Sequence, residues 1–289
     1  GGFGGAIYVA SSTLVVLSCS MSSNSATYGG AIYIESSKLE MTDSTMSSNY
    51  GYNGGCIGSG ASSVVVLTRV AMTSNTGYMG GGYYASSATA SFNMTDCTLS
   101  SNSLSGGYGG GVHIVASMNF YWTRCTFIGN SAGVDGGALR VGSGATGTLI
   151  DCTFTNNHAN RYGGAIDVYS TSTTLHLIGY EFDGNYDSSS AHEDIYRENS
   201  ATIDFQSGCP SGFYNFGSSW LECPSCVSLY LPAVLRSADC SSSSGGTIAN
   251  ITTQTGLEAA LAIDRTLELG SDIELTDTVY LFLGVSNTA

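Results

Sequence analysis

Charged side chains of both signs recur at one position of a repeating pattern, and these residues are the best placed to do chemistry. The position holds Asp43, Arg69, Asp96, Arg124 and Asp151, roughly 25 to 29 residues apart. Asp96, Arg124 and Asp151 could act as acid and base in cleaving a polysaccharide. Opposite charges on neighbouring repeats also cancel the repulsion that a column of one sign would create, and the regular alternation favours this structural role.

The other reactive side chains form no catalytic triad and no metal-ligand spacing. The histidines occupy non-equivalent positions in the repeat, at His113, His158, His176 and His192. Carboxylates gather late in the pattern, at Asp167, Glu181, Asp183, Asp187, Glu193, Asp194 and Asp204. Because they lack the Asp-x-Asn-x-Asp spacing of a calcium loop, we expect a solvated acidic face rather than a calcium site. We predict no catalytic residue, no metal and no cofactor.

A seven-fold repeat must position all of these residues. Every repeat holds a Gly-Gly pair and, about twenty residues later, an asparagine. The pairs begin at Gly4, Gly29, Gly54, Gly80, Gly109, Gly136 and Gly163, and the asparagines are Asn24, Asn49, Asn75, Asn102, Asn130, Asn157 and Asn185. We expect the glycines to form sharp corners with unusual dihedral angles, and the asparagines to form a hydrogen-bonded ladder along the stack.

Between these anchors, apolar and polar residues alternate in about three short runs per repeat, as in strands that point every second residue inward. A unit this short cannot bury its own apolar face and must stack on its copies. The sequence therefore predicts an all-β fold, a parallel β-helix of about seven to eight coils that stack about 4.8 Å apart. A β-propeller is the competing fold, but each of its blades needs about 40 to 50 residues.

The repeat motifs resemble those of a known family. Gly-Gly-Ala-Ile-Tyr-Val at 4 to 9, Gly-Gly-Ala-Ile-Asp-Val at 163 to 168 and Cys-Thr-Phe-x-x-Asn at 125 to 130 look like the repeats of polymorphic outer-membrane-protein-like β-helices, within the pectin-lyase-like superfamily. The resemblance covers about residues 1 to 205 and implies a right-handed coil. It leaves the activity open, because adhesins, fibre proteins and polysaccharide-cleaving enzymes share this fold.

Five of the nine cysteines lie in the repeats. Cys19, Cys97, Cys125 and Cys152 share one inward column, and Cys56 lies elsewhere in its repeat. We expect these five to be free thiols that behave as small apolar residues. Disulfides between coils are the alternative.

The other cysteines, Cys209, Cys223, Cys226 and Cys240, follow the repeats and allow three disulfide pairings. Zinc is a weaker alternative, because one Cys-x-x-Cys pair without a second is a poor metal signal. The stretch Cys-Pro-Ser-Gly-Phe-Tyr at 209 to 214 resembles ephrin-receptor-like cysteine-rich modules. That resemblance favours Cys209 with Cys223 and Cys226 with Cys240. Disulfides imply an oxidising, extracellular compartment.

The composition limits the possible partners. Acidic residues outnumber basic ones, for a net charge of −14, and Lys38 is the only lysine, so the chain lacks the clustered cations that nucleic acid requires. No apolar run reaches the length of a membrane span. The sequons at Asn93 and Asn250 could carry N-linked glycans. Because the chain starts inside a repeat, we expect a processed product or a fragment of a longer tandem polypeptide.

Tyrosines at outward positions suit contact with another molecule. Tyr8, Tyr33 and Tyr84 share one outward column, interrupted by Gly58. Flat aromatic rings in a row on a rigid sheet suit sugar stacking or the lateral packing of filaments. Tyrosine is also an ordinary strand residue, so the column could simply cover the sheet.

The C-terminal segment has the order of a β-helix cap. Residues 255–258 have the capping-box form, residues 259–263 favour a short amphipathic helix, and alternating strands follow. The apolar residues expected to mediate assembly are Leu257, Leu261, Leu267, Leu269, Ile273, Leu275, Val279 and Leu281. We expect this segment to cover and extend the first coil of the next protomer, giving an open head-to-tail homopolymer. The alternative is that it begins the next domain of a tandem chain.

These features predict a β-helix at 1–206, a disulfide-rich linker at 207–246 and a cap-like segment at 247–289. The leading hypothesis is a structural subunit of an extracellular, glycosylated filament or surface appendage. A cell-surface adhesin or glycan-binding module is the second hypothesis, and a polysaccharide lyase or hydrolase is the third. We expect the protein not to be an enzyme.

Overall fold

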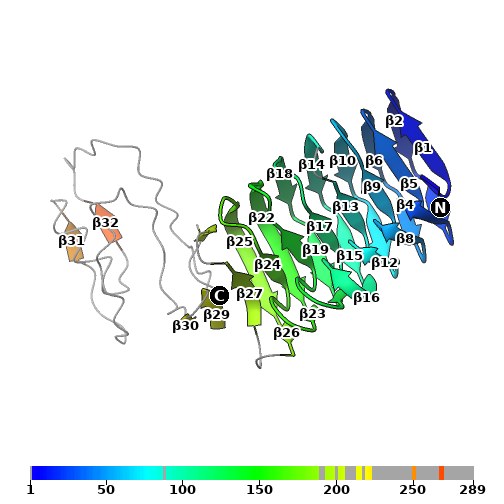
Figure 1. Cartoon of the computed structure of the whole chain (residues 1–289). Helices are drawn as coiled ribbons and strands as arrows, with labels where there is room; N and C mark the ends of the chain where they lie inside the picture. Colours follow the sequence, from blue (N-terminus) through cyan, green and yellow to red (C-terminus); the bar gives the residue numbers. More distant parts are fainter. Residues whose placement is uncertain are drawn as a thin grey trace, which may run out of the picture. The chain divides into compact units, whose positions relative to one another are not determined.

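The computed structural model describes residues 2–86, 89–188, 193–198, 201–205, 213–216, 219–222, 249–251 and 267–269 of the 289-residue chain. The chain divides into two compact units, Gly1–Cys223 and Pro224–Ala289. In the first unit, short strands wind into successive coils that lie side by side along one axis (Figure 1). This confirms the parallel β-helix that the repeat predicts.

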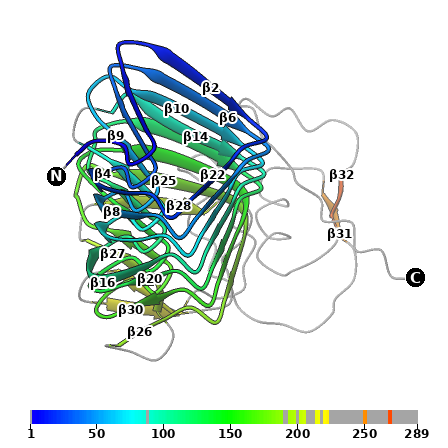
Figure 2. The ribbon, with the colours of Figure 1, turned by 90° about the vertical axis from the view of Figure 1, so that its right-hand side faces the viewer.

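Three sheets run along the stack of coils and enclose a common core (Figure 2). Sheet I is formed by β1 (Ile7–Ala10), β5 (Ile32–Glu35), β9 (Ile57–Ser59), β13 (Tyr83–Ala85), β17 (Val112–Ile114), β21 (Leu139–Val141), β24 (Ile166–Val168), β27 (Glu193–Arg197), β29 (Phe213–Phe216) and β30 (Ser219–Glu222). Sheet III is formed by β4 (Ser25–Tyr28), β8 (Tyr50–Asn53), β12 (Thr76–Met79), β16 (Ser103–Tyr108), β20 (Ser131–Ala132), β23 (His158–Ala159) and β26 (Tyr186–Asp187).

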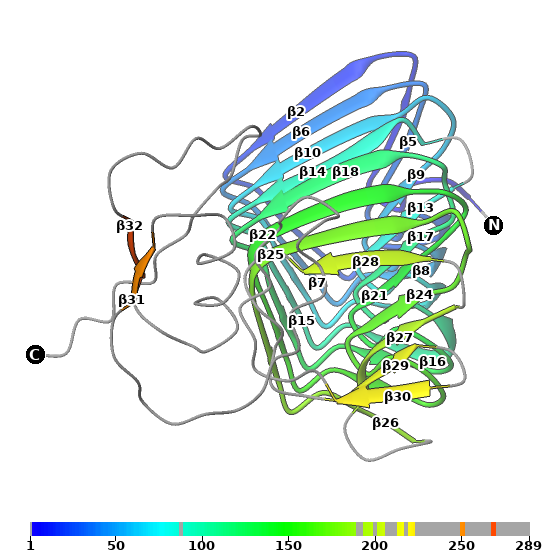
Figure 3. The ribbon, with the colours of Figure 1, turned by 90° about the vertical axis from the view of Figure 1, so that its left-hand side faces the viewer.

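Sheet II has two arms that meet at a corner. The first arm, whose strands lie in order across Figure 3, is β2 (Thr13–Leu17), β6 (Lys38–Thr42), β10 (Val64–Thr68), β14 (Ser91–Thr95), β18 (Asn119–Thr123), β22 (Thr146–Thr155), β25 (Thr174–Asp183) and β28 (Thr202–Phe205). The second arm is β3 (Ser20–Ser22), β7 (Thr45–Ser47), β11 (Ala71–Thr73), β15 (Thr98–Ser100) and β19 (Thr126–Ile128), and the long strands β22 and β25 run through both arms. Most coils therefore have four strands where the sequence predicts about three.

Neighbouring coils pair in parallel and in register, so each column of the repeat becomes a row of stacked side chains. Tyr8 pairs with Tyr33, and Leu39 pairs with Val65. Inward residues such as Leu39, Met46 and Trp122 are fully buried and belong to one apolar cluster that continues from coil to coil. Among the described strands, β29 and β30 form the antiparallel pair of sheet I.

The glycine pairs turn the chain between sheets III and I. Gly54 has a φ of +77°, a conformation that costs other residues energy. At Gly55 a β-carbon would lie 2.2 Å from the carbonyl oxygen of Gly81, so a side chain would push neighbouring coils apart. The corner of sheet II also has positive φ, and it is occupied by the Asp and Arg residues of the alternating column, with Asp43 at 50° and Arg69 at 51°.

The asparagines of the repeat form a continuous ladder inside the coils. The Asn75 Nδ2 atom donates to Asn102 Oδ1 at 3.0 Å and to the Met46 carbonyl at 3.0 Å, and the Asn75 backbone N–H donates to the same Oδ1. The pattern repeats from Asn24 to Asn185, whose Nδ2 donates to Asp194 Oδ1 at 2.9 Å. Each buried amide thus satisfies its polar atoms within the stack.

The five cysteines of the coils are free. Cys56, Cys97, Cys125 and Cys152 are buried, and burial raises the pKa of the Cys56 thiol well above its usual range. Cys19, in the first coil, is exposed, although it lies in register with the buried Ser44 of the next coil.

The second unit contains one described strand pair, in which β31 (Ala249–Ile251) lies parallel to β32 (Leu267–Leu269). Several predicted features lie outside the described residues, namely Cys209, Cys223, Cys226, Cys240, the helix at 259–263, Leu257, Leu261, Ile273, Leu275, Val279 and Leu281.

Candidate binding surface

The alternating charged column forms pairs of opposite charge on the open surface. Arg69 donates to the two carboxylate oxygens of Asp43 at 2.6 and 2.9 Å, and Arg124 donates to those of Asp96 at 2.7 and 2.9 Å. These hydrogen bonds lower the pKa of the Asp43 and Asp96 carboxyls. Since each arginine is held by a carboxylate of the preceding coil, the geometry supports the structural role rather than acid-base catalysis.

The carboxylates of the late coils form the predicted solvated face only in part, since Glu181 and Asp183 are exposed. Asp167, Asp187 and Asp194 are buried, and Asp167 accepts a hydrogen bond from Arg140 Nε at 2.7 Å. Desolvation raises the pKa of Asp167 to about 7. Across the described ranges, no group of three or more His, Cys, Asp or Glu residues could hold a metal ion.

A cation that is only 14% exposed lies against two aromatic rings on the outer side of sheet I. The Arg140 guanidinium carbon is 3.7 Å from the ring centroid of Tyr108 and 4.0 Å from that of Tyr169. His113 precedes Arg140 in the same column and is 2% exposed, beside the rings of Tyr84 and Tyr108. Burial and the charge of Arg140 lower the pKa of His113 to about 3. Sequence reasoning missed this cluster, although the column shared by His113, Arg140 and Asp167 was a signal.

The predicted tyrosine column exists but is not a row of exposed rings. Tyr8, Tyr33 and Tyr84 face outward in register with Gly58. Tyr33 is only 8% exposed, because the rings of Phe3, Tyr8 and Tyr28 pack against it with centroids 4.9 to 6.0 Å away. Tyr84 is half-buried, and Tyr8 donates to Glu35 at 3.1 Å. The three rings therefore do not form one exposed row, and their contact with a glycan or a neighbouring filament stays a prediction.

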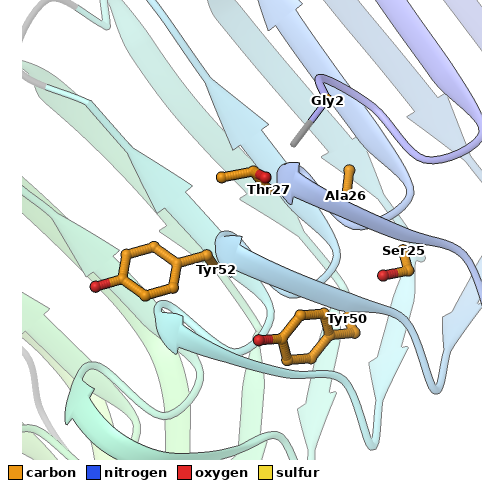
Figure 4. Close-up of a pocket in the computed structure, with 6 residues that line it drawn as sticks. All are labelled: Gly2, Ser25, Ala26, Thr27, Tyr50 and Tyr52. Carbon is orange, nitrogen blue, oxygen red and sulfur yellow. The ribbon is translucent and has the colours of Figure 1, made fainter.

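Three exposed tyrosines lie close together on the outer side of sheet III. Tyr50, Tyr52 and Tyr78 are 51%, 47% and 37% exposed, and the rings of Tyr52 and Tyr78 stack with centroids 4.9 Å apart and planes 9° apart. Figure 4 shows Tyr50 and Tyr52 projecting from the same side of β8, next to residues of β4. The sequence signal was their regular place after the ladder, one and three residues beyond Asn49 and three beyond Asn75.

A glycine determines the path of the strand that carries Tyr50 and Tyr52. Tyr50 and Tyr52 flank Gly51, which points into the coil, where a β-carbon would lie 2.2 Å from the Gly54 carbonyl oxygen. The backbone at Gly51 therefore lies close to the Gly54 corner, and the residues on either side of Gly51 point toward solvent. A hollow of about 450 Å³ opens here, lined by Gly2, Ser25, Ala26, Thr27, Tyr50 and Tyr52 (Figure 4).

One sequon lies on sheet II and the other lies in the second unit. Asn93 is partly exposed on β14 between the buried Phe92 and Met94, and its Oδ1 accepts a hydrogen bond from the Tyr121 backbone N–H at 3.0 Å. Asn250 lies in β31. Glycosylation of both sites stays a prediction.

Comparison with protein families agrees with the observed fold. Residues 2–140 match the family model of the right-handed β-helix region, and residues 151–169 match that of the Chlamydia polymorphic membrane protein repeat. Neither a curated protein nor a solved structure matches the chain. The first unit is thus a parallel β-helix whose residues 2–140 are similar to the right-handed β-helix family and whose residues 151–169 are similar to the polymorphic membrane protein repeat. Neither family match reaches residues 209–240, so the ephrin-receptor-like resemblance has no support there. Within the described part of the chain, no helix is long and apolar enough to span a membrane.

Proposed function

We propose that the chain is the β-helical part of an extracellular, surface-displayed adhesin that binds glycans without cleaving them. The observation that carries this proposal is the tyrosine face of sheet III, defined as Tyr50, Tyr52 and Tyr78. Soluble proteins rarely leave aromatic side chains grouped in the open unless they contact a partner. Tyrosine offers a flat apolar ring and a polar hydroxyl, which together match the two kinds of surface on a sugar.

Two further observations support this assignment. The family match at 151–169 is to a repeat of a membrane protein, which favours a location at a cell surface. The charged column that could have served catalysis forms self-neutralising Asp–Arg pairs, which favours binding over cleavage.

A glycan array tests the proposal with the whole 289-residue chain. Replacing Tyr50, Tyr52 and Tyr78 together by serine should abolish retention on the glycans that the unchanged chain binds. The matched control replaces Tyr121 by serine, because this tyrosine is 50% exposed on β18 of sheet II, away from the three sheet III residues. Retention that survives the triple substitution, in a chain with an unchanged circular dichroism spectrum, would refute the proposed surface.

Assembly into a filament is a second proposal. In the second unit β31 and β32 pair in parallel, as strands of neighbouring coils do in the first unit, which favours a segment able to extend a coil stack. Deleting residues 247–289 should then abolish any filaments seen by electron microscopy while leaving folded chains. Filaments of the truncated chain would exclude this model.

The extracellular location carries its own test. Peptide mapping without reductant should recover Cys209 joined to Cys223 and Cys226 joined to Cys240, with the coil cysteines free. Four free thiols in this segment of the secreted protein would count against an oxidising compartment.

A further inference from the structure

We propose that the hollow beside Tyr52 is a slot for one uncharged sugar ring, which stacks on the open face of the Tyr52 ring. This inference rests on the proposed glycan-binding function and names the site and the class of ligand. Within the tyrosine face, Tyr52 provides the ring on which the sugar stacks. Tyr78 covers the opposite face of that ring, and Tyr50 contributes a hydroxyl to the lining.

The slot is the unfilled position of a stack of rings. Strand pairing places Tyr50 opposite Ser25 and Asn53 opposite Tyr28, so Thr27 stands opposite Tyr52, and the equivalent residue of the next coil is Tyr78. Tyr78 covers one face of Tyr52 by parallel stacking at 4.9 Å. The other face of Tyr52 therefore turns toward the preceding coil, where a threonine replaces the third ring.

The far end of the stack is closed, which leaves one place for a ligand. A β-carbon on Gly106 would lie 3.6 Å from Cε2 of Tyr78, so the backbone of the bulged strand β16 packs against that ring. The stack thus runs from Gly106 through Tyr78 and Tyr52 to the hollow above Thr27. A missing ring in a stack of coils spaced about 4.8 Å apart leaves room for one flat ring.

The lining of the slot selects an uncharged ligand. Its six lining residues provide a ring face, the hydroxyls of Ser25, Thr27, Tyr50 and Tyr52, and backbone groups, but no charged side chain. A pyranose ring can place its C–H face on Tyr52 and exchange hydrogen bonds with these hydroxyls. An acidic sugar would find no cation in the lining, in a chain of net charge −14.

Nuclear magnetic resonance with small probes tests the slot directly. Cellotriose and chitotriose serve as neutral probes and trigalacturonate as the acidic probe. Stacking on Tyr52 should shift the C–H protons on one face of a neutral sugar upfield and give them the strongest saturation transfer. Thr27→Tyr should fill the slot and weaken binding at least tenfold, whereas Thr27→Ser, which keeps the hydroxyl and the space, should leave the affinity within about twofold.

Three results would overturn the proposal. Unchanged binding by the Thr27→Tyr variant would show that the sugar binds outside the slot. The adhesin proposal would still stand in that case if the variant with Tyr50, Tyr52 and Tyr78 replaced by serine lost its retention on the array. Equal or tighter binding of trigalacturonate would contradict the uncharged ligand. Absence of one-sided upfield shifts for every neutral probe, in a chain that binds the array, would contradict stacking on Tyr52.

Discussion

Replacing Trp122 by alanine should destabilise the first unit by about 3 to 5 kcal/mol. Trp122 is fully buried on β18 and lies between Met94 and Leu149 of the adjacent coils. Its ring centroid is 4.9 Å from that of Phe120 and 5.4 Å from that of Phe127. Part of the loss is the transfer free energy of the tryptophan side chain. The rest is the cost of the cavity, which stays open because hydrogen bonds to the adjacent coils keep the backbone from moving inward.

A hydrogen bond adds to this loss. Trp122 Nε1 donates to the Phe92 carbonyl oxygen at 3.2 Å, an interaction worth about 1 kcal/mol in a protein interior. The assay is urea unfolding followed by far-ultraviolet circular dichroism and by tyrosine fluorescence, because coincident transitions are needed to convert midpoints into free energies.

The matched control is Tyr121→Ala, the next residue on the same strand. Tyr121 is also aromatic but half-exposed, so its removal should cost under about 1 kcal/mol. If the two variants unfold at the same urea concentration, the assignment of inward and outward residues on this strand is wrong by one position.

Three more perturbations test other parts of the fold. Asn102→Ala should lower the free energy of unfolding in urea by about 2 to 4 kcal/mol, because it leaves buried donors of the preceding coil without their acceptor. Asn24→Ala, at the half-exposed end of the ladder, should lower it by about 1 kcal/mol. Equal losses would contradict the ladder. The pKa of His113 is about 3 in the folded protein against an ordinary 6.5, so its contribution to stability is complete above pH 6.5 and is lost as the pH falls toward 3. His113→Phe should therefore reduce the loss of unfolding free energy between pH 6.5 and pH 3. An unchanged dependence on pH would exclude His113 as its source. Gly147→Leu should lower the melting temperature, since a β-carbon there would lie 2.1 Å from the Phe120 ring, and Phe120→Ala should restore part of the loss; no rescue would show that the clash lies elsewhere.

The fold could be predicted because every coil repeats the same glycine corner and the same alternation of inward and outward residues. Gly54 marks its corner through a conformation that glycine adopts readily, and Leu39 and Met41 mark an inward face through alternation. What the repeat did not reveal was the strands of sheet III, such as β8, whose inward residue is Gly51 rather than a large apolar side chain. The corner of sheet II is formed by residues such as Arg69, whose positive φ has no sequence signature.

The binding surface was harder to predict, since outward position does not fix exposure. Tyr33 and Tyr50 both face outward, yet three neighbouring rings cover Tyr33 while Tyr50 remains open. Likewise, the burial of Arg140 depends on Tyr108 and Tyr169, which come from different coils and different columns. Such coverage depends on side-chain directions across coils, which alternation along one strand does not encode.

The most direct test of the central claim, that this β-helix binds glycans without cleaving them, is mass spectrometry of a mixed glycan library after incubation with the chain. We expect the protein to retain particular neutral glycans and to release them on denaturation with unchanged masses. Shorter products, or unsaturated ends with a loss of carbohydrate chain length, would show that the protein is an enzyme and would contradict the account.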